Sequence, residues 1–445
     1  MKKRKLRLAP ARLIALGFFV VILVGALLLT LPFASKDGSA NFLDALFTST
    51  SATCVTGLVV RDTFTGWTAF GQGVILCLIQ LGGLGFMTVI TLISFALGKR
   101  VGLYDRKVLM QSAGNFSLSG IRELIRRIIP FAFVFELLGA ALLAIRFVPE
   151  FGPGKGIYFA VFHAISAFCN AGFDLMGGRG AFSSLTAYVA DPLVNLTVCL
   201  LIIVGGLGFL VWHDMVKNGL HWKRYQLHTK LVLTLTAVLV LGGWVLFFIF
   251  ERNASMAGMP LSERVLASLF QSVTPRTAGF NTVDMAALSE PGNLLTNVFM
   301  LIGGSPGSTA GGVKTTTVAV LLLSAISSAR GRTRVNAFHY SIDRDSIRQA
   351  CSILVIYLAM AIAALLALCA IEPITLTQGM FEVNSAIGTV GLSMGITPTL
   401  CTASRLILIL LMYAGRIGGL TFVLLFSERR SEAPVDRPSG KILLG

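Results

Sequence analysis

Apolar runs of about 20 residues recur along this chain, and a helix of that length crosses the roughly 30 Å hydrocarbon core of a bilayer. The composition agrees with this, because 55% of the 445 residues are hydrophobic, only 13% are charged and the mean hydropathy is +0.79, which is outside the range of soluble globular domains. The runs cover residues 13–33, 70–97, 128–148, 193–212, 231–250, 296–323, 353–371 and 406–426. The sequence therefore predicts an all-α polytopic membrane protein with eight spanning helices.

The basic residues are concentrated in alternate connections. Of the 37 Lys and Arg, 26 lie in the two termini and in the connections that follow residues 97, 212 and 323. Positive charge marks the cytoplasmic side of a membrane, so we expect a multi-pass plasma-membrane protein with both termini in the cytoplasm. The net charge of +16 is explained by this sidedness, and we expect no nucleic-acid partner.

A semi-polar segment that ends in glycine occurs four times between apolar runs. The copies read FTSTSATCVTGL, FHAISAFCNAGF, LFQSVTPRTAGF and FEVNSAIGTVGL, and they align on Gly57, Gly172, Gly279 and Gly391. Self-similarity at a nearly constant spacing indicates a repeat architecture. We predict four helix–pore-loop–helix repeats around a central pore, over residues 1–100, 101–216, 217–330 and 331–445.

Each semi-polar segment has about a dozen residues, which is too short to span a bilayer. We expect a half-helix that enters the membrane and an extended strand that returns. Irregular backbone at membrane depth is tolerated only where it is buried in protein or lines a water-filled cavity. Four such segments around one axis would enclose such a cavity.

The returning strands are suited to binding a dehydrated cation. Backbone carbonyls replace the water shell of an ion without holding it too tightly, glycine allows backbone angles closed to other residues, and the C-terminal ends of the half-helices carry partial negative charge. The candidate cation-binding filter residues are Thr53, Cys54, Val55, Thr56, Gly57, Asn170, Ala171, Gly172, Thr277, Ala278, Gly279, Thr389, Val390 and Gly391.

The sixth apolar run contains a stretch, 303–314, that cannot hold a regular helix because it is rich in Gly and includes Pro306. We expect it to break in mid-membrane and to act as a gate below the filter, with Arg416 of the last run hydrogen-bonded to its carbonyls. Lys314 could instead extend to the cytoplasmic interface. The candidate gate residues are Gly303, Gly304, Ser305, Gly307, Ser308, Thr309, Gly311, Gly312, Lys314 and Arg416.

Nothing in the sequence predicts an enzyme. The seven Cys and five His are dispersed, with no metal-ligand spacing, and Gly312-Val313-Lys314 lacks the Gly-Lys-[Ser/Thr] of a phosphate-binding loop. We expect no catalytic residue, no metal site beyond one for potassium, and no cofactor bound by this chain. We expect His163 to have a packing role. Arg276, close to the third filter glycine, is expected to point behind the filter, either toward an acid such as Glu382 or into a hydrogen-bond network.

Five motifs resemble those of the Trk, Ktr and HKT superfamily of potassium transporters, and the chain is most similar to the Ktr membrane subunit of KtrB type. They lie at residues 54–58, at NAGF (170–173), TPRTAGF (274–280), GSTAGGVK (307–314) and GRIGGLTF (415–422). The resemblance implies potassium selectivity from four filter glycines, with potassium as substrate. It also implies a homodimer on cytoplasmic nucleotide-binding regulatory subunits of the RCK (KtrA-like) type. Two departures are Cys54, where the family commonly has Thr, and Asp174, an added carboxylate.

These observations together predict a potassium uptake subunit of the bacterial plasma membrane that works like a channel. The alternative is a secondary transporter that couples potassium to sodium or protons. Such transporters commonly have inverted repeats, whereas all four repeats here begin on the same side. Glu136 and Glu382 are the acids within the membrane that coupling could use.

Overall fold

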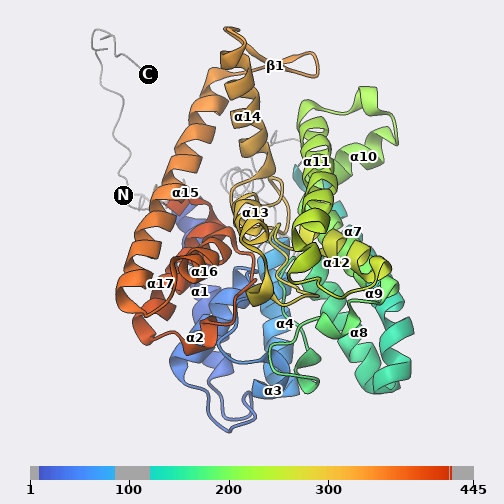
Figure 1. The fold of residues 1–445 in the computed structure, drawn as a ribbon, viewed down its shortest axis with the longest axis vertical. Helices are drawn as coiled ribbons and strands as arrows, with labels where there is room; N and C mark the ends of the chain where they lie inside the picture. Colours follow the sequence, from blue (N-terminus) through green and yellow to red (C-terminus); the bar gives the residue numbers. More distant parts are fainter. Residues whose placement is uncertain (1–9, 86–120, 420, 423–445) are drawn as a thin grey trace, which may run out of the picture.

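The computed structural model describes residues 10–85, 121–419 and 421–422, which are almost wholly helical (Figure 1). One unit recurs four times along the chain: a long first helix, a shorter pore helix, an irregular loop and a second helix. The long first helices are α1 (Pro10–Leu29), α7 (Ile121–Phe151), α11 (Leu227–Phe250) and α15 (Arg344–Ile371).

These four first helices are long and apolar enough to cross a membrane. Their outward faces carry large exposed hydrophobic side chains, such as Leu27 of α1, Leu137 of α7 and Leu366 of α15. In water such faces would be covered by other protein. Their exposure fits contact with lipid, so the chain is a membrane protein with several spans.

The shorter helices, here called pore helices after the place predicted for them, are α2 (Phe42–Thr53), α8 (Pro153–Phe168), α12 (Leu261–Val273) and α16 (Leu376–Gly388). The sequence signals their starts in different ways. The side chain of Asn41 accepts a hydrogen bond from Leu43 N, Pro153 occupies the first position of α8, and Thr375 forms a capping box with Gln378, all of which favour helix initiation. Each pore helix ends at the loop that leads to a filter glycine.

The second helices are shorter than predicted: α4 (Ala69–Leu84), α9 (Pro192–Leu207), α13 (Glu290–Leu301) and α17 (Thr402–Ile417). Three of them end at a glycine in the left-handed region, Gly85, Gly208 and Gly418. After Gly208 the chain turns by 92° into α10 (Phe209–Asn218). After Leu301 it runs irregularly to α14 (Thr315–Ala329).

The break in the run 296–323 is present as predicted, whereas the prediction of an unbroken helix over 193–212 is wrong. The chain breaks in both, because a left-handed glycine or a Gly-Pro stretch cannot continue a helix. A break had been predicted in the sixth run only. The last parts of the runs 70–97 and 406–426 lie outside the described residues.

Glycines in the second helices allow them to approach the pore helices closely. A Cβ atom on Gly82, Gly205 or Gly415 would lie within 3.0 Å of a backbone carbonyl oxygen in the last turn of the pore helix of the same repeat. Small residues permit such contact between helices in lipid. Each second helix thus holds the end of a pore helix.

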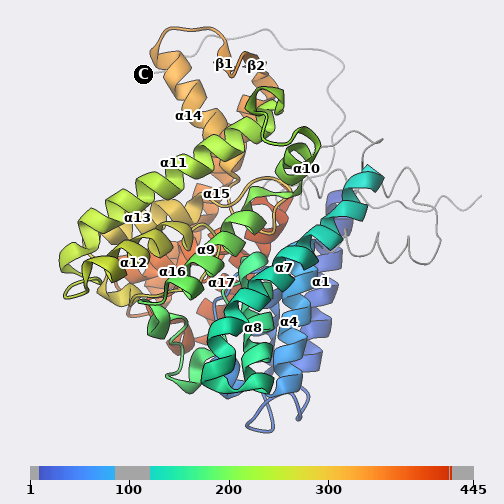
Figure 2. The same ribbon diagram turned by 90° about the vertical axis from the view of Figure 1, so that its right-hand side faces the viewer.

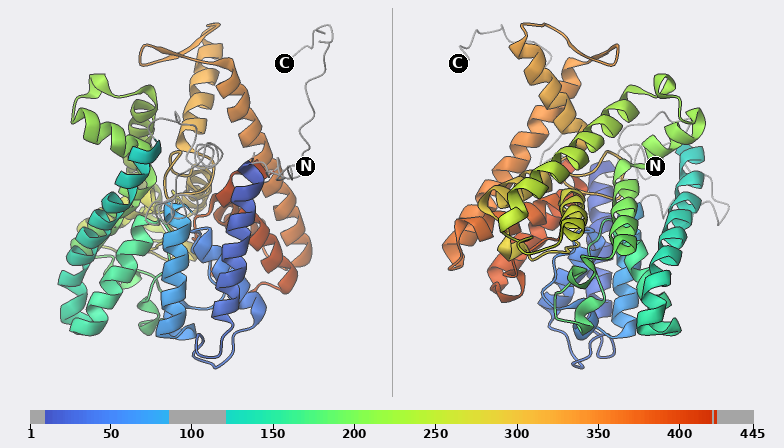
Figure 3. Two further views of the ribbon diagram at one scale, coloured as in Figure 1. Left: turned by 180° about the vertical axis from the view of Figure 1, so that it is seen from behind. Right: turned by 45° about the vertical axis from the view of Figure 1, so that its right-hand side comes forward.

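The four repeats are arranged in a closed ring. Each second helix also contacts the pore helix of the next repeat: α4 contacts α8, α9 contacts α12, α13 contacts α16, and α17 contacts α2. The helices of repeats 1 and 2 lie side by side in Figure 2. The view from behind in Figure 3 places the blue helices of repeat 1 between those of repeats 2 and 4.

The remaining elements connect these helices. A two-stranded hairpin, β1 (Val335–Ala337) and β2 (Tyr340–Ile342), joins α14 to α15 at one end of the molecule, and the short helix α3 (Thr63–Gly66) lies near the other end (Figure 1). The 3-10 turns are η1 (Met176–Gly178), η2 (Thr186–Tyr188), η3 (Trp222–Arg224), η4 (Glu251–Asn253), η5 (Met285–Ala287) and η6 (Thr397–Thr399).

Candidate functional site

The four aligned glycines meet at the centre of the ring. All four have positive φ: +93° at Gly57, +68° at Gly172, +82° at Gly279 and +95° at Gly391. A Cβ atom on any of them would lie within 3.0 Å of the carbonyl oxygen that precedes the glycine of the next repeat. Those carbonyls belong to Ala171, Ala278, Val390 and Thr56, in that order. Only glycine fits these positions, and four carbonyl groups come together around one axis.

The residue two before each glycine is also left-handed, although none of the four is glycine. The φ angles are +56° at Val55, +58° at Asn170, +70° at Thr277 and +52° at Thr389. Side chains disfavour this conformation by about 1–2 kcal/mol each, and such outliers cluster at functional sites. The same strain at the same register in four loops indicates a shared constraint on where their peptide groups point.

Hydroxyl groups near the end of each pore helix hold the loops in place. In repeats 1 and 4, Ser51 Oγ and Ser385 Oγ each accept a hydrogen bond from the backbone N–H of the filter glycine, at 3.0 Å. In repeats 2 and 3, Ser166 Oγ and Thr274 Oγ1 donate to the carbonyl of the residue after the glycine. Each hydroxyl offsets part of the strain in its loop.

Nearly all the predicted filter residues are buried, and Gly391 is half-buried. The hydroxyl oxygens of Thr53, Thr56 and Thr389 have no hydrogen-bond partner within the described part of the chain. Buried hydroxyls are normally paired. These three are therefore free to meet a water molecule or an ion.

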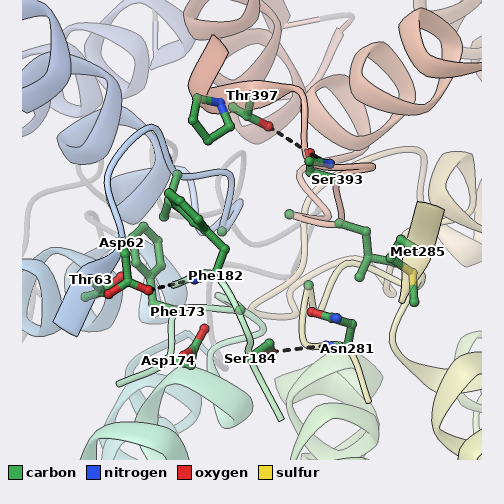
Figure 4. A pocket seen from close by; sticks show the side chains of 18 of the residues that line it. Asp62, Thr63, Phe173, Asp174, Phe182, Ser184, Asn281, Met285, Ser393 and Thr397 are labelled. Atoms are coloured by element: carbon green, nitrogen blue, oxygen red, sulfur yellow. Dashed lines mark hydrogen bonds between the residues drawn. The ribbon is translucent and has the colours of Figure 1, made fainter. Parts of the chain in front are cut away.

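A cavity of about 210 Å³ lies on one side of the glycine ring and is lined by all four filter glycines and the segments that follow them. Figure 4 shows its side chains converging from four differently coloured parts of the chain. We call it the vestibule. Its carboxylates are Asp62, Asp174 and Asp284. Only Asp174 had been singled out from the sequence, although each of the three follows a filter glycine within five residues.

Two vestibule carboxylates also organise the loops. Asp62 accepts hydrogen bonds from Thr65 N and from Phe182 N, so it joins repeat 1 to repeat 2 (Figure 4). Asp174 is half-buried and accepts one hydrogen bond, from Met176 N at 2.9 Å. Removal from water, with a smaller contribution from the charge of Asp62, raises the pKa of Asp174 to about 7.

On the opposite side of the glycine ring lies the irregular segment 303–314, here called the intramembrane loop. Thr309 Oγ1 donates to Phe168 O at the end of pore helix α8. Ser305 Oγ donates to Gly206 O near the break after α9, and a Cβ atom on Gly312 would lie 3.0 Å from Gly388 O at the end of α16. The loop therefore lies against the ends of the two helices α8 and α16.

Two basic side chains hold this loop. Arg416 donates to Thr309 O within the loop and to Gly82 O and Gly83 O of α4, so the predicted contact of Arg416 with loop carbonyls is present. Lys314 Nζ folds back onto Ala310 O at 2.7 Å and Gly311 O at 3.3 Å. Its ammonium group therefore donates hydrogen bonds to carbonyl groups of the loop.

Of the two alternatives for Arg276, the pair with Glu382 is absent and a hydrogen bond to a neutral side chain is present. Arg276 is buried and donates to Thr236 Oγ1 of α11 at 3.5 Å, and its Nε has no partner among the described residues. Glu382 accepts instead from Ser393 Oγ and Thr397 Oγ1. The two side chains therefore contact different parts of the chain.

Another intramembrane acid, Glu136 of α7, accepts both of its hydrogen bonds from Gln80 Nε2 of α4. Within the described residues, no group of three His, Cys, Asp or Glu could hold a metal ion.

Several known proteins are similar in sequence to this chain over nearly its full length. The family model described as TrkH, cation transport protein, matches residues 17–436. The potassium/sodium uptake protein NtpJ of Enterococcus hirae is 44% identical, with 100% of this chain and 99% of that protein aligned. The Ktr system potassium uptake protein B is 42% identical in Bacillus subtilis, over 99% of this chain and 97% of that protein, and 37% identical in Vibrio alginolyticus, over 100% and 97%.

A solved structure has the same fold. The potassium transporter TrkH from Vibrio parahaemolyticus aligns with a TM-score of 0.74 at 19% identity, and the match covers 96% of this chain and 86% of that chain.

Proposed function

Since the chain belongs to the TrkH family of cation transport proteins, we propose that it is a potassium uptake subunit of the bacterial plasma membrane that conducts potassium through the ring of four loops. The ring of carbonyls beside Gly57, Gly172, Gly279 and Gly391 carries this proposal. Several oxygen donors around one axis can replace the water shell of a potassium ion, and none of them bears a full charge that would trap it.

The proposed filter comprises the carbonyls and hydroxyls of the segments 53–57, 170–172, 277–279 and 389–391. The unpartnered hydroxyls of Thr53, Thr56 and Thr389 support it, because they offer further neutral oxygens. The three vestibule carboxylates raise the local concentration of cations at the entrance. The pore helices direct the negative ends of their dipoles toward the opposite side of the filter.

The intramembrane loop is the proposed gate. It is irregular, lies against the ends of α8 and α16, and is held by side-chain contacts of Arg416, Lys314, Ser305 and Thr309. A segment in this position blocks the pathway below the filter until those contacts break.

The membrane arrangement follows from the positive charges. We propose that each of the four repeats, with the boundaries given above, crosses the bilayer twice, its second crossing being broken or bent as described. The vestibule then faces outward and the hairpin between α14 and α15 lies in the cytoplasm, in agreement with the basic connections.

The proposed subunit assembly is based on the names of the relatives. The Ktr system potassium uptake proteins B are named as parts of a system, and we propose that this chain forms a homodimer on cytoplasmic nucleotide-binding regulatory subunits of RCK type. We propose that the chain itself is no enzyme and binds no cofactor.

Flux measurements on the purified protein in liposomes test the function. A potassium gradient alone should drive uptake of rubidium as a tracer, and the reversal potential should follow potassium. The name of the Enterococcus relative includes sodium, so the coupled alternative must be separated. A reversal potential that shifts with sodium or protons at a fixed stoichiometry would establish coupling, and an absence of any potassium flux would contradict the proposal.

A further inference from the structure

One position in the pore helices differs in chemistry among the four repeats. Nine residues before the filter glycine stand Thr48, His163, Phe270 and Glu382, in repeats 1 to 4. All four side chains are fully buried. Two of them, His163 and Glu382, make hydrogen bonds to the segment that follows the filter glycine of their own repeat.

In repeat 4, both carboxylate oxygens of Glu382 are used. One accepts from Ser393 Oγ, and the other accepts from Thr397 Oγ1 at 3.0 Å. Ser393 Oγ also accepts from Gly395 N at 2.9 Å. Ser393, Gly395 and Thr397 all line the vestibule, and Figure 4 shows Ser393 and Thr397 beside each other on its wall. Glu382 therefore fixes the segment that begins two residues after Gly391.

In repeat 2, His163 makes the corresponding contact. Its Nε2 accepts from Leu175 N at 3.3 Å, three residues after Gly172. Because Nε2 is an acceptor, the ring proton lies on Nδ1, which donates to Phe159 O at 2.7 Å. Both ring nitrogens of the neutral imidazole are thus satisfied, and the ring holds the loop after Gly172 against α8.

Repeats 1 and 3 lack this contact. The Thr48 hydroxyl has no hydrogen-bond partner in the described ranges, and Phe270 offers no polar atom. In the ring order established above, repeats 2 and 4 face each other across the pore. The two segments held from this position of the pore helix therefore form one opposite pair, and the other two are held by other contacts, such as that of Asn281 N with Ser184 Oγ.

We infer that His163 and Glu382 are positioning residues that set ion selectivity by holding the outer ends of two opposite filter loops. This inference rests on the proposed function. A filter distinguishes potassium from sodium by how closely its carbonyls can follow the ion. Loosening one loop just beyond its glycine lets the carbonyl of the preceding residue move inward and accept the smaller ion.

The test compares matched substitutions at this one position. Glu382→Leu and His163→Phe remove the acceptors, and the second gives repeat 2 the residue found in repeat 3. Glu382→Gln removes the charge and keeps an amide that can bond both hydroxyls. The control is Thr48→Val, which removes a hydroxyl with no partner. The measurement is the sodium-to-potassium permeability ratio in liposomes.

We expect Glu382→Leu and His163→Phe each to raise this ratio about tenfold, which corresponds to about 1.4 kcal/mol, while Glu382→Gln and Thr48→Val stay near the wild-type ratio. A general loss of folded protein would lower both permeabilities without changing their ratio. If the Glu382→Leu protein does not insert into the membrane, Ser393→Ala removes the other partner of this hydrogen bond. It should likewise raise the sodium-to-potassium permeability ratio.

Two results would overturn the inference. One is a ratio in His163→Phe and Glu382→Leu that equals that of Thr48→Val. The other is a change in Glu382→Gln as large as in Glu382→Leu, since charge rather than position would then decide selectivity. Wild-type protein without potassium flux would contradict the proposed function itself, and this is measured before any variant.

Discussion

At the scale of single residues, the proposed filter consists of backbone in conformations that most side chains disfavour. Val55, Asn170, Thr277 and Thr389 are left-handed without being glycine, at about 1–2 kcal/mol each. The hydroxyls of Ser51, Ser166, Thr274 and Ser385 each contribute a hydrogen bond of about 1 kcal/mol to the same loops. The conformation is thus kept by contacts with the pore helices.

Replacing Gly391 by Ser should lower selectivity for potassium. A side chain there would meet Thr56 O and the Cα atom of Gly57 in the neighbouring loop, so the carbonyls of repeats 1 and 4 must move apart. We expect the potassium-to-sodium permeability ratio to fall about tenfold, equivalent to about 1.4 kcal/mol. Relative permeabilities of potassium, rubidium and sodium measure it.

Gly258→Ser is the control for this substitution. Gly258 is also left-handed, at +75°, but a Cβ atom there would have nothing within 4 Å. It therefore carries the backbone strain without the clash. An equal loss of selectivity in both variants would show that a general destabilisation of the fold, and not contact with the next loop, is responsible.

Asp174 should make uptake depend on pH. Its pKa of about 7 means that the carboxyl is charged above pH 7 and becomes neutral as the pH falls through 7. The attraction for cations is therefore present in alkaline medium and lost in acid. We expect potassium uptake at low potassium concentration to decrease from pH 8 to pH 6. In Asp174→Asn, uptake should equal the wild-type value at pH 6 over this whole pH range. A variant with the pH profile of the wild type would exclude this carboxyl as the source.

The sequence predicted some of these residues and not others. The filter glycines were found because they repeat in register, and Arg416 because it is a charge within an apolar run. Asp62 and Asp284 were missed, and His163 was expected only to pack. Their contacts, such as that of Asp62 with Phe182 of the next repeat, depend on how separate loops meet, which spacing along one chain does not reveal.

At the scale of elements, the first helices and the break in the sixth run were predicted, and the break in the run 193–212 was not. Long apolar runs determine α1, α7, α11 and α15. Hydropathy does not distinguish a straight helix from one that turns by 92° at Gly208, because glycine hardly changes the average. Gly82 and Gly205 allow close packing against the pore helices, whereas Gly85 and Gly208 end α4 and α9.

Deletion of 304–312 should raise potassium flux, because it removes the proposed gate. Arg416→Lys should act in the same direction more weakly, since one ammonium group cannot span Thr309 O and Gly82 O as the guanidinium does. Rubidium efflux from liposomes measures both. Unchanged or abolished flux in protein that elutes as a folded species would count against gating by this loop.

At the scale of the whole molecule, the proposed orientation places Cys401 and Cys351 on opposite sides of the membrane. Both are exposed; Cys401 precedes α17, near the vestibule, and Cys351 lies near the start of α15. In chains in which one of the two is the only cysteine left, an impermeant maleimide applied to intact cells should label Cys401 and should label Cys351 only after permeabilisation. The reverse labelling pattern would show that the chain has the opposite orientation in the membrane.

The contact between Gly391 and the carbonyl of Thr56 joins the last repeat to the first. During synthesis, the first pore loop therefore enters the bilayer long before its final neighbour has left the ribosome. Until then its polar backbone has a partner on one side only. A chain that stops short of the fourth repeat has an open ring, and its half-inserted loops would be ready substrates for membrane quality-control proteases.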